Sequence, residues 1–145
     1  MSFGWINWIN IAVVDCLICI NLVAVRKGVA GSFCSKYPVV NVMEQIGRYG
    51  CMAFMILPVF TSGWEFGFRT VAEMLIWIWL TILLLVTYLI FWMKKEKGKR
   101  GILYGLAMIP VILFLMNGIL LRHPVLIAAS LIFGVFHCVV VRENT

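Results

Sequence analysis

PVVNVMEQIGRYGCMAFMILPVFTS, residues 38–62, is apolar and long enough to cross a bilayer, yet its middle carries Glu44, Gln45 and Arg48. A charged residue at the centre of a spanning helix costs roughly 3 kcal/mol on insertion scales. Such residues are kept where they face a protein interior, pair with each other, or handle a solute or a proton. The segment therefore predicts a membrane helix with a polar centre.

The composition of the whole chain sets its class. Of the 145 residues, 63% are hydrophobic and 12% are charged, whereas soluble domains carry about 25% charged residues. The sequence therefore predicts an integral membrane protein with a single domain. The net charge of +6 comes from basic residues placed mostly between the apolar runs, which indicates contact with lipid headgroups rather than with nucleic acid.

Four further apolar runs accompany this segment, so we expect an all-α integral membrane protein, a compact bundle of five transmembrane helices. We expect the first run to be a retained span and not a signal peptide, because no basic segment precedes it and Arg26 and Lys27 follow it. The last long apolar run is about twice the length of a span and is divided at Arg122-His123-Pro124. The expected spans are residues 5–25, 38–61, 70–93, 101–121 and 124–141.

Basic residues also predict the orientation. With the N-terminus outside and the C-terminus inside, nine basic residues lie in the inner segments and two, Arg69 and Arg122, lie outside. The positive-inside rule favours this topology, and we expect the plasma membrane of a bacterium as the location. An engineered thiol at Gly67 should then be reachable from outside, and one at Gly98 should not.

Comparing depth between the spans brings polar residues together. Asp15 and Arg48 lie near the middle of the first and second spans, which predicts an ion pair between them. Glu44 lies one helical turn from Arg48 and also pairs with it. Asn21 and His137 are expected at the depth of Glu44. We interpret these five residues as the candidate ligand-binding site.

Two interpretations of this site stay open. Polar side chains contribute about 0.6 kcal/mol each between membrane helices, so the cluster, together with Asn10 and Asn117 further outward, is in one interpretation only structural. In the other, Asp15 and Glu44 outnumber Arg48, and the acid left unpaired stays protonated, binds a cation or receives the positive group of a ligand such as a protonated amine. Glu44 is then the candidate residue.

Motifs for other chemistry are weak. Cys16 and Cys19 form a CxxC, but no cysteine lies in an outer loop to receive electrons. Soft-metal binding by these two with Cys51, Met52 and Met55 is a further alternative, as is an intramembrane enzyme that uses Glu44, Asp15 or His137 as acid or base. We expect no metal and no cofactor, and a non-enzymatic function is favoured over the intramembrane enzyme, which stays open.

The favoured function is binding or movement of a small solute or ion through the buried polar centre. The alternative is a non-enzymatic membrane interaction protein, namely an assembly, immunity or regulatory subunit. The expected partners are the lipid bilayer, a small-molecule or cation ligand, and either a second copy of the chain or another membrane protein. No nucleic-acid partner is expected.

Overall fold

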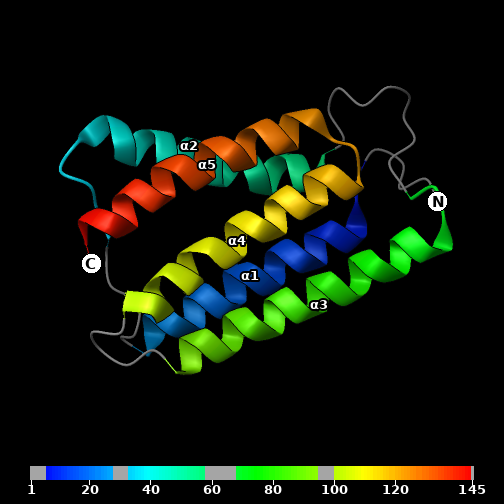
Figure 1. The fold of residues 1–145 in the computed structure, drawn as a ribbon, viewed down its shortest axis with the longest axis horizontal. Coiled ribbons are helices and arrows are strands. Elements are labelled where there is room, and N and C mark those ends of the chain that lie inside the picture. Colours follow the sequence, from blue (N-terminus) through cyan, green and yellow to red (C-terminus); the bar gives the residue numbers. More distant parts are fainter. Residues whose placement is uncertain (1–5, 28–32, 58–67, 95–99, 145) are drawn as a thin grey trace.

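The computed structural model describes residues 6–27, 33–57, 68–94 and 100–144. These residues form helices and contain no strand. The helices, shown in Figure 1, are α1 (Trp8–Arg26), α2 (Pro38–Ile56), α3 (Val71–Met93), α4 (Arg100–Leu120) and α5 (Pro124–Glu143).

Four of these helices are long and apolar enough to cross a membrane, namely α1, α3, α4 and α5. They contain 19 to 23 residues, and a bilayer needs about 20. The all-helical membrane class predicted from the sequence is thereby confirmed. α2 is not among the four, because Asn41, Glu44, Gln45 and Arg48 lower its mean hydropathy.

The observed helix bounds agree closely with the expected spans. α3, α4 and α5 each begin and end within two residues of the expected limits. The chain turns at Leu121–His123, which confirms the predicted division of the last long apolar run. Position 5 and positions 58–61, at the edges of the first two expected spans, lie outside the described residues.

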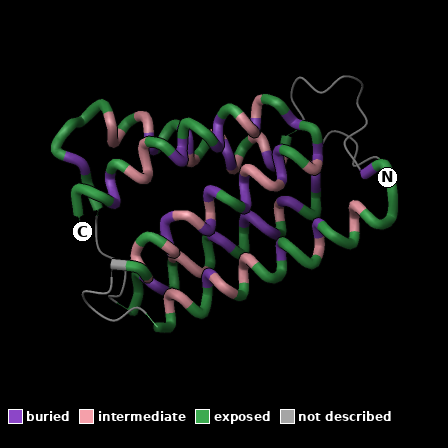
Figure 2. Tube along the Cα trace, in the orientation of Figure 1, coloured by how far each residue is buried: buried purple, intermediate pink, exposed green. Residues whose placement is uncertain are grey.

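Two groups of helices make up the bundle (Figure 1). α2 and α5 lie side by side as one pair, and α5 also packs against α4. α4 packs in turn against α3, and α1 contacts both α2 and α3. Figure 2 shows that burial is concentrated where these helices face each other and that much of α3 is exposed.

Both ends of α2 are tied to the ends of other helices. At one end, the backbone N–H of Asn7, just before α1, donates to the carbonyl oxygen of Ile56 at 2.9 Å. At the other end, the backbone N–H of Lys36 donates to a carboxylate oxygen of Glu143 at 3.1 Å. α2 therefore extends over the same length of the bundle as its neighbours.

Glycine allows α2 and α5 to approach closely. A Cβ atom added to Gly47 would lie 2.8 Å from the Cα and N atoms of Phe133, which is closer than real Cβ atoms come. Small residues permit such backbone contact between membrane helices. The contact brings the middle of α2, with its charged residues, directly against the middle of α5.

A short turn joins α4 to α5. Arg122 has a φ of 53°, and its guanidinium pairs with the carboxylate of Glu73 at 2.8 Å. His123 is fully buried and caps α5, because its Nδ1 accepts from the N–H of Leu126 at 3.1 Å. Burial lowers the pKa of His123, which keeps Nδ1 available as an acceptor. The turn closes this end of the bundle.

Candidate functional site

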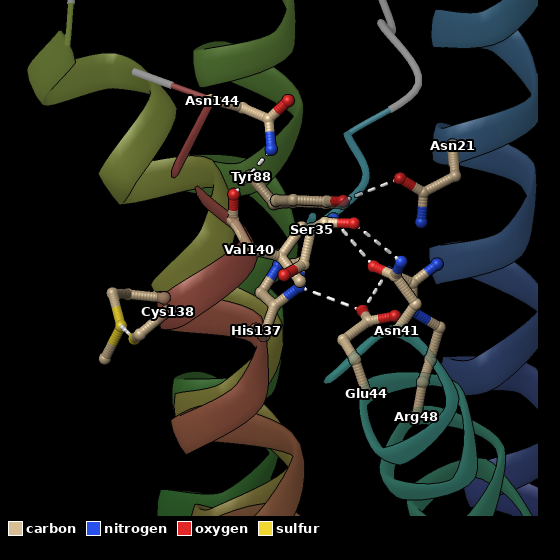
Figure 3. A network of polar contacts seen from close by, with 11 residues as sticks. Asn21, Ser35, Asn41, Glu44, Arg48, Tyr88, His137, Cys138, Val140 and Asn144 are labelled. Carbon is tan, nitrogen blue, oxygen red and sulfur yellow. Dashed lines mark hydrogen bonds and ion pairs between the residues drawn. The ribbon is translucent and has the colours of Figure 1, made fainter. Parts of the chain in front are cut away.

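The polar centre predicted from the sequence is built around the carboxylate of Glu44. Only 3% of Glu44 is exposed. Its Oε1 atom accepts from the guanidinium of Arg48, one turn further along α2, and lies 3.0 Å from Nδ1 of His137 on α5. Figure 3 shows His137 and Arg48 on either side of the carboxylate. The predicted Glu44–Arg48 pair and the shared depth of Glu44 and His137 are confirmed.

Phe133 supports both basic residues of this centre. Its ring stacks on the ring of His137, with centroids 4.8 Å apart and an interplanar angle of 28°. The guanidinium carbon of Arg48 lies 5.8 Å from the centroid of the same ring, within the range of a cation–π contact. Because the backbone of Phe133 contacts Gly47, the ring is held at a fixed place between α2 and α5.

A cavity of about 490 Å³ lies next to this centre. Pockets for small molecules typically measure roughly 300–1,000 Å³, so the cavity is of ordinary ligand-binding size. Its wall is apolar over most of its extent and includes residues of all five helices. The side chains on that wall with a polar or ring-nitrogen group are Asn21, Arg48, Tyr49, Tyr88, Trp92 and His137.

Arg48 brings a permanent charge to the wall of the cavity, and no Asp, Glu or Lys side chain among the described residues lines it. Its side chain is 36% exposed, against 4% for the side chain of Glu44. Within the described part of the chain, one guanidinium nitrogen, Nη2, has a hydrogen-bond acceptor, namely Glu44. A guanidinium has five N–H donors, so donors remain on the cavity side.

Asn21 and Tyr88 face Arg48 from other helices. The hydroxyl of Tyr88 donates to Oδ1 of Asn21 at 2.7 Å, and Nδ2 of Asn21 donates to the carbonyl oxygen of Leu17 at 2.9 Å. Asn21 was predicted at the depth of Glu44, and it lines the same cavity as His137. Tyr88 was not predicted as a site residue. Its hydroxyl group in the inner half of the third span, near the depth of Asn21, could have indicated it.

The predicted ion pair between Asp15 and Arg48 is wrong. Asp15 is exposed, does not line the cavity, and has no ion pair with any described residue. α1 turns Val14 and Leu17 into the bundle, and each residue rotates by about 100° around a helix. That rotation places Asp15 on the outer face. Among the described residues, the centre therefore holds one carboxylate and one guanidinium, without the predicted surplus of acid.

The outward asparagines make bonds of their own within the core. Nδ2 of Asn10 donates to the carbonyl oxygen of Met55 at 2.9 Å, which links α1 to α2. Oδ1 of Asn117 accepts from Nε1 of Trp77 at 2.8 Å, which links α4 to α3. Both asparagines are fully buried. These contacts agree with the structural interpretation of the two residues.

The cysteines do not gather at one place. Cys16 and Cys19 are exposed on α1, whereas Cys51 is buried in the core with Met55. Among the described residues, no group of three or more His, Cys, Asp or Glu side chains could hold a metal ion. The sulfur atoms considered as a soft-metal set are thus divided between the outer face, the core and, for Met52, the cavity wall.

A second polar contact, which was not predicted, orders the start of α2 near the cavity. The backbone N–H of Ser35 donates to Oδ1 of Asn41 at 2.7 Å, and Nδ2 of Asn41 donates to the carbonyl oxygen of Ser35 at 3.0 Å (Figure 3). The neighbouring Phe33 reaches the cavity wall. Pro38 occupies the first turn of α2, as predicted.

No protein-family model, curated protein or solved structure matches this chain. The class that the fold and the candidate site define is therefore a small helical membrane protein with a cavity beside a buried ion pair.

Proposed function

We propose that this chain binds a small solute in the cavity beside Arg48, as a transporter, a channel or an accessory subunit of a transport system. The observation that carries the proposal is that Arg48, anchored by the buried Glu44, lines a cavity of about 490 Å³ in a protein that is otherwise largely apolar. A purely structural ion pair would need no such space around its guanidinium.

The energetics of the pair support the same proposal. Charges within a membrane protein are costly, and they mark pathways for solutes or protons in many such proteins. A buried ion pair is in itself weak evidence for stability. Here Glu44 and the ring of Phe133 hold Arg48 in place, so the guanidinium is preorganised for a ligand and the ordering cost of binding falls.

The cavity extends from the middle of the bundle towards one end. Along α1 it is lined from Leu17 to Val25, and along α3 it includes Tyr88 and Trp92. The other half is filled by buried side chains, among them Asn10, Met55 and Leu126. We propose that the described arrangement is a state open on one side, and that any transport requires opening of the filled half.

We also propose that α2 is a fifth membrane span and that the N-terminus lies outside. The contacts of Asn7 with Ile56 and of Lys36 with Glu143 support a span, because they tie the two ends of α2 to neighbouring helices at opposite ends of the bundle. The end of the bundle that holds Lys36 also holds more of the basic residues, including Arg26, Lys94 and Arg142. The positive-inside rule then assigns this end to the cytoplasm and the outer one to the exterior of a plasma membrane.

Thiol labelling tests this orientation. Gly67 and Gly98, the positions chosen from the sequence, lie outside the described residues, so two exposed positions replace them. A charged, membrane-impermeant maleimide on intact cells should label Arg69→Cys in a Cys34→Ser background, because Arg69 lies at the outer end. The native Cys34 should react only after the cells are permeabilised. Labelling of Cys34 on intact cells would contradict the proposed orientation and favour the opposite one.

The interaction-protein alternative rests on a different part of the molecule. α3 presents large apolar side chains over most of its length, among them Leu75, Trp79, Leu83 and Val86. Lipid covers such a face in a monomer, and a second copy or another membrane protein covers it in a complex. Under this alternative, changes on the exposed face of α3 should impair function and changes in the cavity should not.

Filling the cavity tests the proposed solute binding. Ala107 lines the cavity and is buried, whereas Ala128 is exposed on α5 and does not line it. We expect mass spectrometry of the purified wild type to detect a co-purified small molecule that Ala107→Phe loses and Ala128→Phe retains. The gentler Ala107→Leu should retain an intermediate amount. Equal amounts in all four proteins would contradict binding in the cavity.

A further inference from the structure

The cavity opens sideways, between α1 and α2. Ile18, Leu22 and Val25 on α1 and Tyr49 on α2 all line it, yet they are 39% to 65% exposed. Among the described residues, the hydrogen bonds that join α1 and the residue before it to α2 come from Asn7 and Asn10, at the outer end. The two helices thus meet at the outer end and leave a lateral opening in the inner half, where these apolar side chains face lipid.

From this opening, and resting on the proposed solute binding, we propose that the ligand is a lipophilic acid. It enters from the bilayer between α1 and α2 and places a carboxylate-type oxygen head against Arg48. The apolar body of the ligand then lies along the aliphatic and aromatic wall of the cavity.

The donors on the wall select the head group. Arg48 presents guanidinium N–H groups that Glu44 does not use, and a guanidinium can bind a carboxylate through two parallel hydrogen bonds. Asn21 has a second N–H on Nδ2, since one N–H donates to Leu17. The proton of the Tyr88 hydroxyl is already donated to Asn21. A ligand that brings acceptor oxygens therefore fits this wall.

A cation does not fit the same wall. Glu44, the cation site expected from the sequence, does not line the cavity. Its carboxylate is 4% exposed and already contacts both Arg48 and His137. A positively charged ligand in the cavity would meet Arg48 first, and like charges in an environment of low dielectric repel each other strongly.

The apolar wall limits the body of the ligand. Leu106, Ala107, Pro110 and Phe114 of α4 form one side. Along α1 the cavity covers two helical turns, which is about 12 Å at 1.5 Å per residue. A single medium-length chain or a compact ring system fills such a space.

The place of Arg48 argues against a bilayer phospholipid as the occupant. Arg48 lies near the middle of α2, so the acid head must enter the core of the membrane. The phosphate of a two-chain lipid stays at the surface of the bilayer. The guanidinium can draw inward a lipophilic acid with one small head. The two candidate occupants, lipophilic acid and phospholipid, are distinguishable because only the acid should compete with another carboxylate for Arg48.

Fluorescence quenching tests the ligand class. Trp92 lines the cavity, so a bromine atom on a bound ligand should quench its emission. The probes are bromododecanoate, bromododecanol and bromododecyltrimethylammonium, added to the protein in nanodiscs. Subtracting the quenching of Trp92→Phe isolates the signal of Trp92. Bromododecanoate should quench this signal saturably at a concentration at least roughly tenfold lower than the other two, since only its head can accept charge-assisted hydrogen bonds from Arg48.

Variants complete the test. Arg48→Met should remove the preference for the carboxylate, and Ala107→Phe should remove saturable quenching by all probes while Ala128→Phe retains it. Equal quenching by the three heads, or a preference for the ammonium probe, would overturn the acid ligand while leaving solute binding intact. Saturable quenching that persists in Ala107→Phe would overturn both the acid ligand and its cavity. Excess phosphatidylglycerol in the nanodisc should not displace bromododecanoate, and displacement would assign the site to a bilayer lipid.

Discussion

Replacing Gly47 by alanine should lower the free energy of unfolding by about 3 kcal/mol, the upper end of the usual cost of overpacking. The new Cβ would lie 2.8 Å from backbone atoms of Phe133, and a backbone cannot move aside as a flexible side chain can. α2 and α5 would have to separate. Thermal unfolding of the protein in detergent measures the effect.

Gly50→Ala is the matched control for this change. A Cβ on Gly50 would lie 3.8 Å from its nearest neighbours, Ala129 and Phe54, which is ordinary contact. Alanine favours a helix over glycine by up to about 1 kcal/mol, so Gly50→Ala should leave stability unchanged or raise it slightly. If Gly47→Ala is as stable as Gly50→Ala, the described packing of α2 on α5 is incorrect.

The helices were predictable because hydropathy alone decides them. Runs of about 20 apolar residues separated by charged or proline-containing segments give the bounds of α3, α4 and α5 almost without error. α2 was expected from the same length argument in spite of its charges. In each case the signal lies within one segment, and no knowledge of its neighbours is required.

The sequence predicted the depth of the site residues in the membrane, but not how each helix is rotated about its own axis. Counting residues from the middle of each span brought Glu44 and His137 to one level, and their side chains lie 3.0 Å apart. The same count paired Asp15 with Arg48, although Asp15 is exposed on the far side of α1. Its rotation was readable in principle, because Asn10, Val14 and Leu17 form a helical face that excludes Asp15.

The roles of Phe133 and Tyr88 depend on which helices are neighbours. Phe133 supports Arg48 and His137 only because α5 packs on α2, and Tyr88 reaches Asn21 only because α3 packs on α1. A single sequence gives the order of spans along the chain but not their order in the membrane. The cavity between them could therefore not be predicted from the sequence.

Arg48→Met should have the other large effect, a loss of about 3 kcal/mol in the free energy of unfolding. The substitution keeps an unbranched apolar chain but leaves the 3%-exposed Glu44 without its cation. Removing one partner of a buried pair typically costs about 3–5 kcal/mol, and the contact of His137 with Glu44 places this case at the lower end. Thermal unfolding in detergent is again the measurement.

The double variant Glu44→Gln with Arg48→Met decides whether an unpaired charge causes that loss. It removes both charges, so much of the stability should return, because a buried pair is itself worth little against neutral groups. Asp15→Asn is the matched control, since the exposed Asp15 has no ion pair within the described residues and its change should be neutral. A double variant as unstable as Arg48→Met would contradict the paired centre. A recovered double variant that no longer retains the co-purified solute would separate the function of Arg48 from its part in folding.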